Sequence, residues 1–241
     1  MSKLIELMNR TLFRDTPSSL DDITFAARVK DLLQPNHQLL DLGAGAGVVP
    51  QLRFRGVARR VCGVDPDPRV LENPNLDDAK VGDTENIPFP DESFDIVIST
   101  NVLEHLPDPA KAFLEVARVL KPGGIFLVKT PNWWNYMPPL AMITPVSLHD
   151  RLNPKPGGDE EDSFPVLYRA NTSRSIRRYA AGAGMRLRSV RMIDGRAGYL
   201  TFNALAYFLG WIYHWMVTRV PGLDRFSICL IAEMERLPRI E

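Results

Sequence analysis

Three glycines at alternate positions follow a short apolar run near residue 40. The run Leu39–Leu42 predicts a buried strand, and Gly43, Gly45 and Gly47 come directly after it. Glycine permits backbone angles closed to other residues and lets a ligand lie against bare main chain. Because Val48 comes next, the spacing is GxGxG and falls short of the GxGxxG that seats a pyrophosphate. The pattern predicts a loop that holds a nucleoside cofactor.

An acidic residue lies within or directly after this apolar run and each of the next two expected strands. Asp41 lies inside the first, Asp65 ends the second and begins a turn with Pro66, and Asp83 with Thr84 follows the third. The carboxyl ends of parallel strands meet at one edge, where a carboxylate can accept hydrogen bonds from a ribose or an adenine amino group. Singly, these acids are equally typical of turns and helix caps. Three in order favour a cofactor site.

One histidine falls at the same predicted edge of the sheet. His105 follows the expected strand Phe94–Ser99, in a segment that also contains Asn101 and Val102. An imidazole can accept a proton near neutral pH, so His105 is a candidate general base. The alternative is a structural hydrogen bond near the helix expected after Pro107, and both interpretations stay open.

Short apolar runs alternate with helical patterns along the chain, which predicts an α/β fold with a parallel sheet and helices on both faces. The expected helices cover residues 20–33, ending before Pro35, and 171–184. The expected strands cover residues 38–42, 60–64, 80–82, 94–99, 125–129 (after a turn at 121–124), 185–193 and 226–234.

The composition is that of an ordinary globular protein. The 241 residues carry 29 basic and 29 acidic side chains, so no nucleic acid is expected as a partner. Cys62 and Cys229 lie in apolar runs, and no metal-binding spacing is present. The first fifteen residues lack the apolar core of a secretory signal, which favours a cytoplasmic protein.

Four segments together resemble the class I S-adenosylmethionine-dependent methyltransferases, most closely the ubiquinone and menaquinone biosynthesis group. They are LLDLGAGAG from residue 39, GVDPDP from 63, GDTENIPFPDESFDIVISTNVLEHLPDP from 82 and LEVARVLKPGGIFLVKTPN from 114. The resemblance implies a Rossmann-like, doubly wound sheet of seven strands with an antiparallel last strand. It also implies one methyltransferase domain over residues 1–241, with N-terminal helices at 1–37, a cofactor-binding half at 38–132 and an acceptor-binding half at 133–241.

The same resemblance implies roles for individual residues. The methionine end of S-adenosylmethionine would be held by the glycine loop and its acid, the ribose by the second acid, and the adenine by the third. Carried over by position, the cofactor-binding residues are Asp41, Gly43, Ala44, Gly45, Gly47, Asp65, Pro66, Asp83 and Thr84, with Asn101 and Val102 beside the sulfonium. The acceptor-binding candidates are Trp133, Tyr136, His149, Tyr168 and Arg169.

Residues 197–218 contain no Asp, Glu, Lys or Arg. The stretch is long enough to span a bilayer. However, the family's last two strands pair as a hairpin, and Val220–Phe226, reaching about 23 Å, is too short to recross the membrane. The pattern therefore predicts a helical insert at about 197–219. It could serve as a lid over a lipophilic acceptor, as an interfacial helix that gives peripheral membrane association, or as a homodimer contact or ordinary core.

The leading hypothesis is an enzyme that methylates a small or amphiphilic, lipid-like acceptor, at oxygen. Residues 133–241 carry 14 basic against 10 acidic side chains, which favours an acidic or amphiphilic ligand there. Two alternatives stay open. The loop could hold a nicotinamide dinucleotide in an oxidoreductase or epimerase, or the chain could be a non-catalytic cofactor-binding module that contacts a partner or membrane through the apolar insert.

Overall fold

The computed structural model describes residues 3–139, 165–196 and 198–238. The chain forms two compact units that interleave along the sequence. The first, here called the sheet unit, comprises Asp22–Thr130, Val166–Arg191 and the residues from Leu230 onward. The second, the helical unit, comprises the residues up to Asp21, those from Pro131 to Pro165, and Met192–Cys229.

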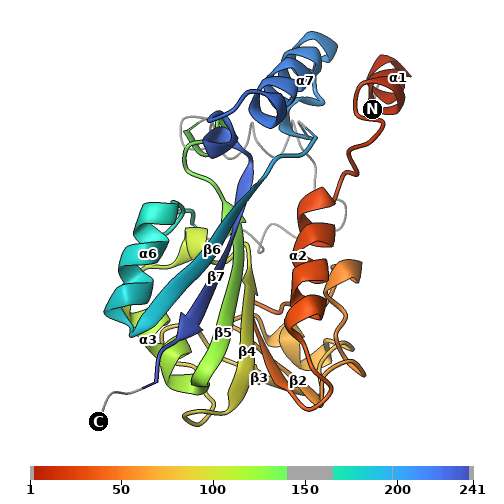
Figure 1. Cartoon of the computed structure of the whole chain (residues 1–241). Coiled ribbons are helices and arrows are strands. Elements are labelled where there is room, and N and C mark those ends of the chain that lie inside the picture. Colours follow the sequence, from red (N-terminus) through yellow and green to blue (C-terminus); the bar gives the residue numbers. More distant parts are fainter. Residues whose placement is uncertain (1–2, 140–164, 197, 239–241) are drawn as a thin grey trace. The chain divides into compact units, whose positions relative to one another are not determined.

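Seven strands form one sheet, in the order β3-β2-β1-β4-β5-β7-β6 (Figure 1). The strands are β1 (Gln38–Leu42), β2 (Arg60–Asp65), β3 (Asp78–Val81), β4 (Phe94–Thr100), β5 (Leu120–Pro131), β6 (Met185–Ile193) and β7 (Cys229–Arg236). The strands β1 to β5 pair in parallel, whereas β7 runs antiparallel between β5 and β6. The predicted seven-stranded α/β fold and the pairing of the last two strands are confirmed.

The register of β1 sets the position of the glycine loop. Asp41 pairs with Gly63 on β2 and with Ile98 on β4, so the ends of these three strands lie at one edge. β1 is apolar apart from Asp41 and its first residue, and Leu39 and Leu40 are fully buried. Strands buried on both faces are typical of parallel sheets covered by helices. The sheet thus places the loops after β1, β2 and β4 beside one another.

Helices cover both faces of the sheet. The helices that do so are α2 (Leu20–Leu32), α3 (Pro109–Val119) and α6 (Ser173–Gly182). The helical unit contains two further helices, α1 (Lys3–Thr11) and α7 (Ala204–Arg219). α2 lies on one face, and α3 and α6 lie together on the other (Figure 1). Asp108 caps α3 by accepting from the N–H groups of Ala110 and Lys111, and Thr172 forms a capping box with Ser175. Both predicted helices, 20–33 and 171–184, are confirmed.

Two predicted boundaries were wrong. Residues 121–124 were expected to form a turn, but they belong to β5, which begins at Leu120 and pairs with β4 through a register shift between Phe94 and Ile96. Gly123, with φ at +78°, allows this bulge. The last strand was expected at 226–234 but begins at Cys229, because Asp224–Phe226 forms a 3₁₀ turn before it.

The helical unit has its own small apolar core. Ile5 of α1, Phe13 and Tyr207 of α7 are buried together, and the Trp211 indole donates to the carbonyl of Leu12 at 3.0 Å. Asn203 caps α7 because its side chain accepts hydrogen bonds from the N–H groups of Leu205 and Ala206. The predicted insert at about 197–219 is therefore helical from Ala204 onward. Of the helices in the described part of the chain, none has the length and apolar character needed to cross a membrane.

Candidate cofactor site

The three glycines of the loop all adopt backbone angles that other residues avoid. Gly43, Gly45 and Gly47 have φ values of +79°, +48° and +72°. A Cβ atom at Gly43 would overlap the side chain of Val102, and one at Gly47 would overlap that of Asn73. The conformation requires glycine, as the sequence predicted, and the close packing against Val102 and Asn73, which the sequence did not predict, requires it as well.

Two asparagines that the sequence analysis did not identify hold this loop. The Asn73 amide donates to the carbonyls of Ala44 and Gly45, both at 3.1 Å, and the Asn75 amide donates to the carbonyl of Gly47 at 3.0 Å. Asn73 is buried. In the sequence, Asn-Pro-Asn is only a turn signal, because its partners lie almost thirty residues away.

The loop borders a cavity of about 190 Å³. Its lining includes six of the predicted cofactor residues, namely Asp41, Gly43, Ala44, Gly45, Gly47 and Asn101, together with Asn73, Asn75 and Thr100. The structure thus brings together residues from the ends of β1 and β4 and from the segment after β2. The bare main chain of the loop forms one wall, which fits a ligand that binds against backbone.

Asp41 is the buried acid of this cavity. Its Oδ1 atom is buried and has no hydrogen-bond partner among the described residues. Burial, and secondarily the nearby charge of Asp65, raises the pKa of Asp41 to about 7. A buried carboxyl without a partner is costly for the folded protein. The site therefore contains an acceptor that a cationic or hydrogen-bond-donating ligand group would satisfy.

Asp65 lies at the tip of β2 and contacts the glycine loop. Its Oδ2 accepts the N–H of Gly45 at 2.9 Å, and its Oδ1 accepts the N–H of Asp67 at 2.9 Å. Burial raises its pKa, and these two hydrogen bonds oppose the rise. Asp65 is buried beside the cavity and is not part of its lining, while Pro66 is exposed. Each carboxylate oxygen keeps a second lone pair for a ribose hydroxyl.

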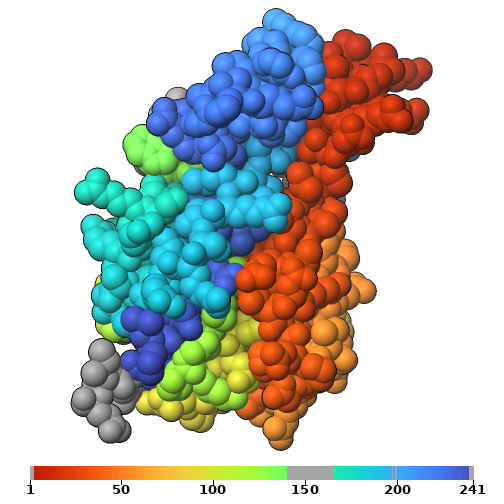
Figure 2. Space-filling model, in the orientation of Figure 1, coloured from red at the N-terminus to blue at the C-terminus, as the bar shows by residue number. Residues whose placement is uncertain are grey.

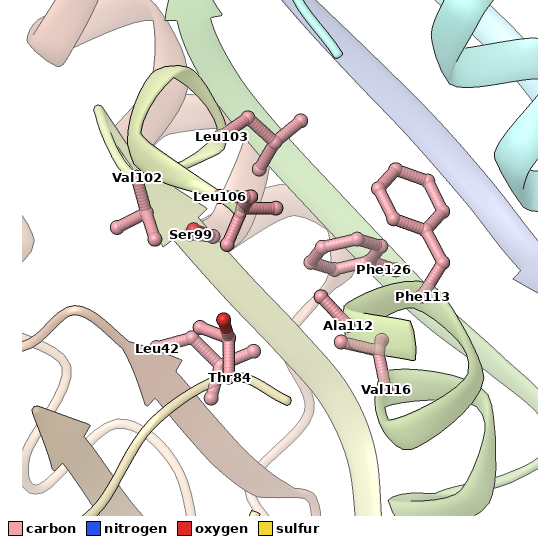
Figure 3. Close-up of a pocket in the computed structure, with 10 residues that line it drawn as sticks. All are labelled: Leu42, Thr84, Ser99, Val102, Leu103, Leu106, Ala112, Phe113, Val116 and Phe126. Carbon is pink, nitrogen blue, oxygen red and sulfur yellow. The ribbon is translucent and has the colours of Figure 1, made fainter. Parts of the chain in front are cut away.

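The predicted adenine-binding residues lie after β3. Asp83 is exposed and accepts the N–H of Glu85 at 2.7 Å. Thr84 lies with Leu42, Ser99 and Val102 around a second, smaller cavity of about 10 Å³ (Figure 3). The structure therefore brings Thr84 and Val102 together beside the loop, whereas Asp83 lies outside both cavities.

The segment after β4 contains Asn101 and His105. Asn101 has φ at +55°, which is uncommon for a residue other than glycine, and its N–H donates to the Lys129 carbonyl at 2.9 Å. His105 ends the 3₁₀ turn Leu103–His105 and is half-buried. Asn101, on the cavity, and His105 therefore lie on one short segment held against β5.

Beneath this segment lies a buried polar network that sequence reasoning also missed. Thr130 on β5 donates to the Glu104 carboxylate at 3.0 Å and accepts from the Asn171 amide at 2.6 Å. All three residues are buried, and burial is the main reason that the pKa of Glu104 is raised. The Glu104 carbonyl also accepts the N–H groups of Leu167 and Tyr168. Glu104 thus links β5, the segment before α6 and the turn that ends at His105.

The predicted acceptor-binding residues divide between the two units. Tyr168 and Arg169 belong to the sheet unit, where Tyr168 binds the Glu104 carbonyl and Arg169 donates to the carbonyl of Pro107. Trp133 and Tyr136 belong to the helical unit, and the Tyr136 ring lies 5.0 Å from that of Tyr213. His149 lies outside the described residues.

The chain is similar to known methyltransferases over the part that carries the glycine loop. Residues 40–128 match a family described as the methyltransferase domain. A probable S-adenosylmethionine-dependent methyltransferase of Mycolicibacterium smegmatis is 40% identical over 105 residues, covering 42% of this chain and 40% of that protein. The uncharacterized methyltransferase YcgJ of Bacillus subtilis is 32% identical over 130 residues, covering 50% of this chain and 51% of that protein. The chain thus matches about half or less of the length of these curated relatives.

Solved structures show the same fold over most of the chain. The crystal structure of YcgJ aligns with a TM-score of 0.56 and 20% identity, covering 90% of this chain and 99% of that one. An S-adenosylmethionine-dependent methyltransferase from Mesorhizobium loti aligns with a TM-score of 0.55 and 18% identity, covering 92% and 99%.

Residues 40–128, which carry the glycine loop and most of the parallel strands of the sheet, thus match a methyltransferase domain, and a relative of this region is named as a probable S-adenosylmethionine-dependent methyltransferase. The cofactor of such methyltransferases is S-adenosylmethionine, and the residues present fit it. The glycines line the cavity with bare main chain, and Asp41 provides a buried acceptor that lacks a partner among the described residues. The narrower resemblance to the ubiquinone and menaquinone group stays a prediction.

Proposed function

We propose that this protein transfers a methyl group from S-adenosylmethionine to a small or amphiphilic acceptor, at oxygen, as a single methyltransferase domain. The observation that carries the proposal is the buried, unpartnered Asp41 carboxyl in the cavity beside Gly43, Gly45 and Gly47. S-adenosylmethionine supplies a methyl group bound to a positively charged sulfur. A carboxylate next to bare main chain suits its cationic methionine end, and its ribose would lie at Asp65.

The protein's own part in such a reaction is alignment, exclusion of water and, for a hydroxyl acceptor, removal of a proton. Asn101 lines the cavity, and His105 lies four residues later on the same segment. We propose that His105 acts as the general base and accepts the proton that the acceptor hydroxyl loses. Tyr168 and Arg169, which hydrogen-bond to backbone carbonyls on either side of His105, are proposed to shape the acceptor side of the site.

The choice of cofactor is tested by calorimetry. The purified protein is titrated with S-adenosylhomocysteine, with S-adenosylmethionine and with NAD. We expect both sulfur compounds to bind and NAD to give no heat, because the GxGxG spacing lacks the glycine of the dinucleotide loop. Binding of NAD alone would assign the chain to the dinucleotide-dependent enzymes and overturn the proposal.

Methyl transfer is tested with S-adenosylmethionine labelled on its methyl group, incubated with phenolic, carboxylic and isoprenoid acceptors. We expect label in the product with the wild type, and a loss of turnover of at least about tenfold in His105→Ala with unchanged S-adenosylhomocysteine affinity. Equal turnover would show that His105 is structural. Cofactor binding without transfer to any acceptor class would favour the non-catalytic module.

A further inference from the structure

One side of α7 exposes a continuous apolar stripe. Leu205, Leu209 and Trp215 are 68%, 56% and 48% exposed, and Phe208 and Met216 lie between and after them. Spacings of three, four and seven residues relate these positions, so their side chains share one side of the helix. Figure 2 shows α7 at the surface, beside α1. Large apolar side chains scattered singly over a surface need no explanation, but a stripe along a whole helix does.

The opposite side of α7 is firmly packed in the helical unit. Tyr207 is buried, Trp211 donates to the Leu12 carbonyl at 3.0 Å, and His214 Nδ1 lies 2.7 Å from the Asp194 carboxylate. The helix is therefore fixed in its orientation, and the exposed stripe does not result from a detached segment. A helix that is apolar all round is normally buried on every side, whereas the described structure covers α7 on one side.

The charges around the stripe indicate what would cover the other side. From Gly195 to Leu223 the only charged residues are Arg196 and Arg219. Arg196 donates to the Thr16 carbonyl inside the unit, whereas Arg219 is exposed in the last turn of α7. The stripe thus contains no carboxylate and ends in a cation, which complements an anionic surface. Trp215, one turn before Arg219, is the residue type that favours the headgroup region of a bilayer.

Exposed side chains of α1 extend this character within the same unit. Leu4 and Leu7 are exposed, and so are two cations on either side of them, Lys3 and Arg10, and one carboxylate between them, Glu6. α1 packs on α7 through the shared core. Apolar side chains bordered by long cationic ones are typical of surfaces that lie at a membrane interface, because the cations reach the headgroups.

The length of α7 limits the mode of contact. Its 16 residues, at roughly 1.5 Å each, span about 24 Å, less than the roughly 30 Å of a hydrocarbon core. We propose that the exposed side of α7 docks flat on a membrane surface, with its apolar stripe at the acyl boundary and Arg219 at anionic headgroups. This inference is independent of the proposed methyl transfer.

The test is co-sedimentation of the full chain with vesicles. Wild type is compared with the double variant Leu205→Gln/Leu209→Gln and with Leu114→Gln, a control that replaces a leucine of similar exposure (54%) on α3. The vesicles contain phosphatidylcholine, with or without phosphatidylglycerol. We expect wild type and Leu114→Gln to bind the anionic vesicles, and the double variant to partition at least about tenfold less. Arg219→Gln should reduce the preference for phosphatidylglycerol.

Two results would overturn the proposal. One is equal partitioning of the double variant and wild type, with circular dichroism showing that all variants are folded. The other is no binding of wild type to either vesicle. If wild type binds neither vesicle, analytical ultracentrifugation tests whether a second copy of the chain covers the stripe instead. Self-association of wild type that the double variant loses would assign this side of α7 to an interface between two copies.

Discussion

The Asp65 carboxylate accepts the backbone N–H of Gly45 at 2.9 Å, and so connects the tip of β2 to the middle of the glycine loop. Gly45 has φ at +48°, and its carbonyl accepts the Asn73 amide. The loop is therefore held from two sides by side chains that come from β2 and from the segment after it. Asp65 therefore supports the glycine loop, and its remaining lone pairs are the ones that we propose for the ribose.

Asp65→Ala should weaken S-adenosylhomocysteine binding by about ten- to a hundredfold, because it removes a charge-assisted hydrogen bond and the proposed ribose acceptor. Calorimetry measures the change. The matched control is Asp78→Ala, which removes a half-buried carboxylate on β3 that pairs with Arg60 at 2.9 Å, away from the loop. Unchanged affinity in Asp65→Ala, or an equal loss in both variants, would contradict the role of Asp65.

Asp41→Asn should make the unliganded protein more stable at alkaline pH. The pKa of Asp41 is raised from 3.8 to about 7, so the folded state binds more protons than the unfolded state between these values. The free energy of unfolding therefore falls as the pH rises through this window and levels off above it. The amide has no charge to bury. Between pH 5 and pH 8, the wild type should lose on the order of 2–3 kcal/mol relative to the variant.

Urea unfolding at several pH values measures this difference, and calorimetry on the same samples measures cofactor affinity. We expect Asp41→Asn to gain stability at pH 8 and to bind S-adenosylhomocysteine more weakly. The buried carboxylate lowers the stability of the unliganded protein, but it is the group that we propose to bind the ligand. A variant that is less stable than wild type at pH 8 would show that Asp41 has a structural partner.

Gly47→Ala should affect both stability and binding, whereas Gly56→Ala should affect stability alone. The two glycines have similar φ values, +72° and +81°, so each alanine costs about 1 kcal/mol in backbone strain. A Cβ at Gly56 meets nothing within 4 Å, but one at Gly47 overlaps Asn73, which holds the loop. We expect an additional loss of S-adenosylhomocysteine affinity of at least about tenfold in Gly47→Ala. Equal affinities of Gly47→Ala and Gly56→Ala for S-adenosylhomocysteine would mean that the loop accommodates the additional methyl group at position 47 without losing its binding conformation.

The parts of this fold that the sequence predicted are those set by local patterns. Leu39–Leu42 is apolar on both faces and the glycines follow at once, so strand and loop could both be placed within a few residues. Asn73 and Asn75 could not, because their loop partners are distant in sequence and Asn-Pro-Asn is locally a turn. The bulge in β5 was missed for a similar reason: Pro122 and Gly123 are typical of turns, and the strand begins before them only because Leu120 pairs with the distant Phe94 on β4.

The role of Glu104 in the candidate site also could not be predicted from the sequence. Its position next to His105 is visible in the sequence, but its burial and its contact with Thr130 depend on β5 lying beneath the turn. The segment after β4 could therefore be identified as a site, while the group that holds it in place could not. We regard Glu104 as a positioning residue, since it contacts the proposed site through the backbone and through Thr130.

Glu104→Ala should destabilise the protein by about 2–4 kcal/mol, because the buried Thr130 hydroxyl, which Asn171 also contacts, loses its acceptor. Glu104→Gln keeps a carbonyl oxygen for Thr130 and removes the charge. Burial raises the pKa of Glu104, so the folded state favours its protonated form, and this part of the stability is lost as the pH rises above the unfolded value of 4.5. Glu104→Gln should remove that pH dependence and restore much of the stability.

The same pair of variants separates positioning from mere stability. At a temperature where both are folded, Glu104→Ala should lower kcat for methyl transfer with S-adenosylhomocysteine affinity retained, because the turn that carries His105 loses its anchor on β5. Glu104→Gln should recover most of kcat. If Glu104→Gln recovers stability but not kcat, the negative charge beside His105 matters more than the hydrogen bond to Thr130, and the pH profile of kcat in this variant should then change as well.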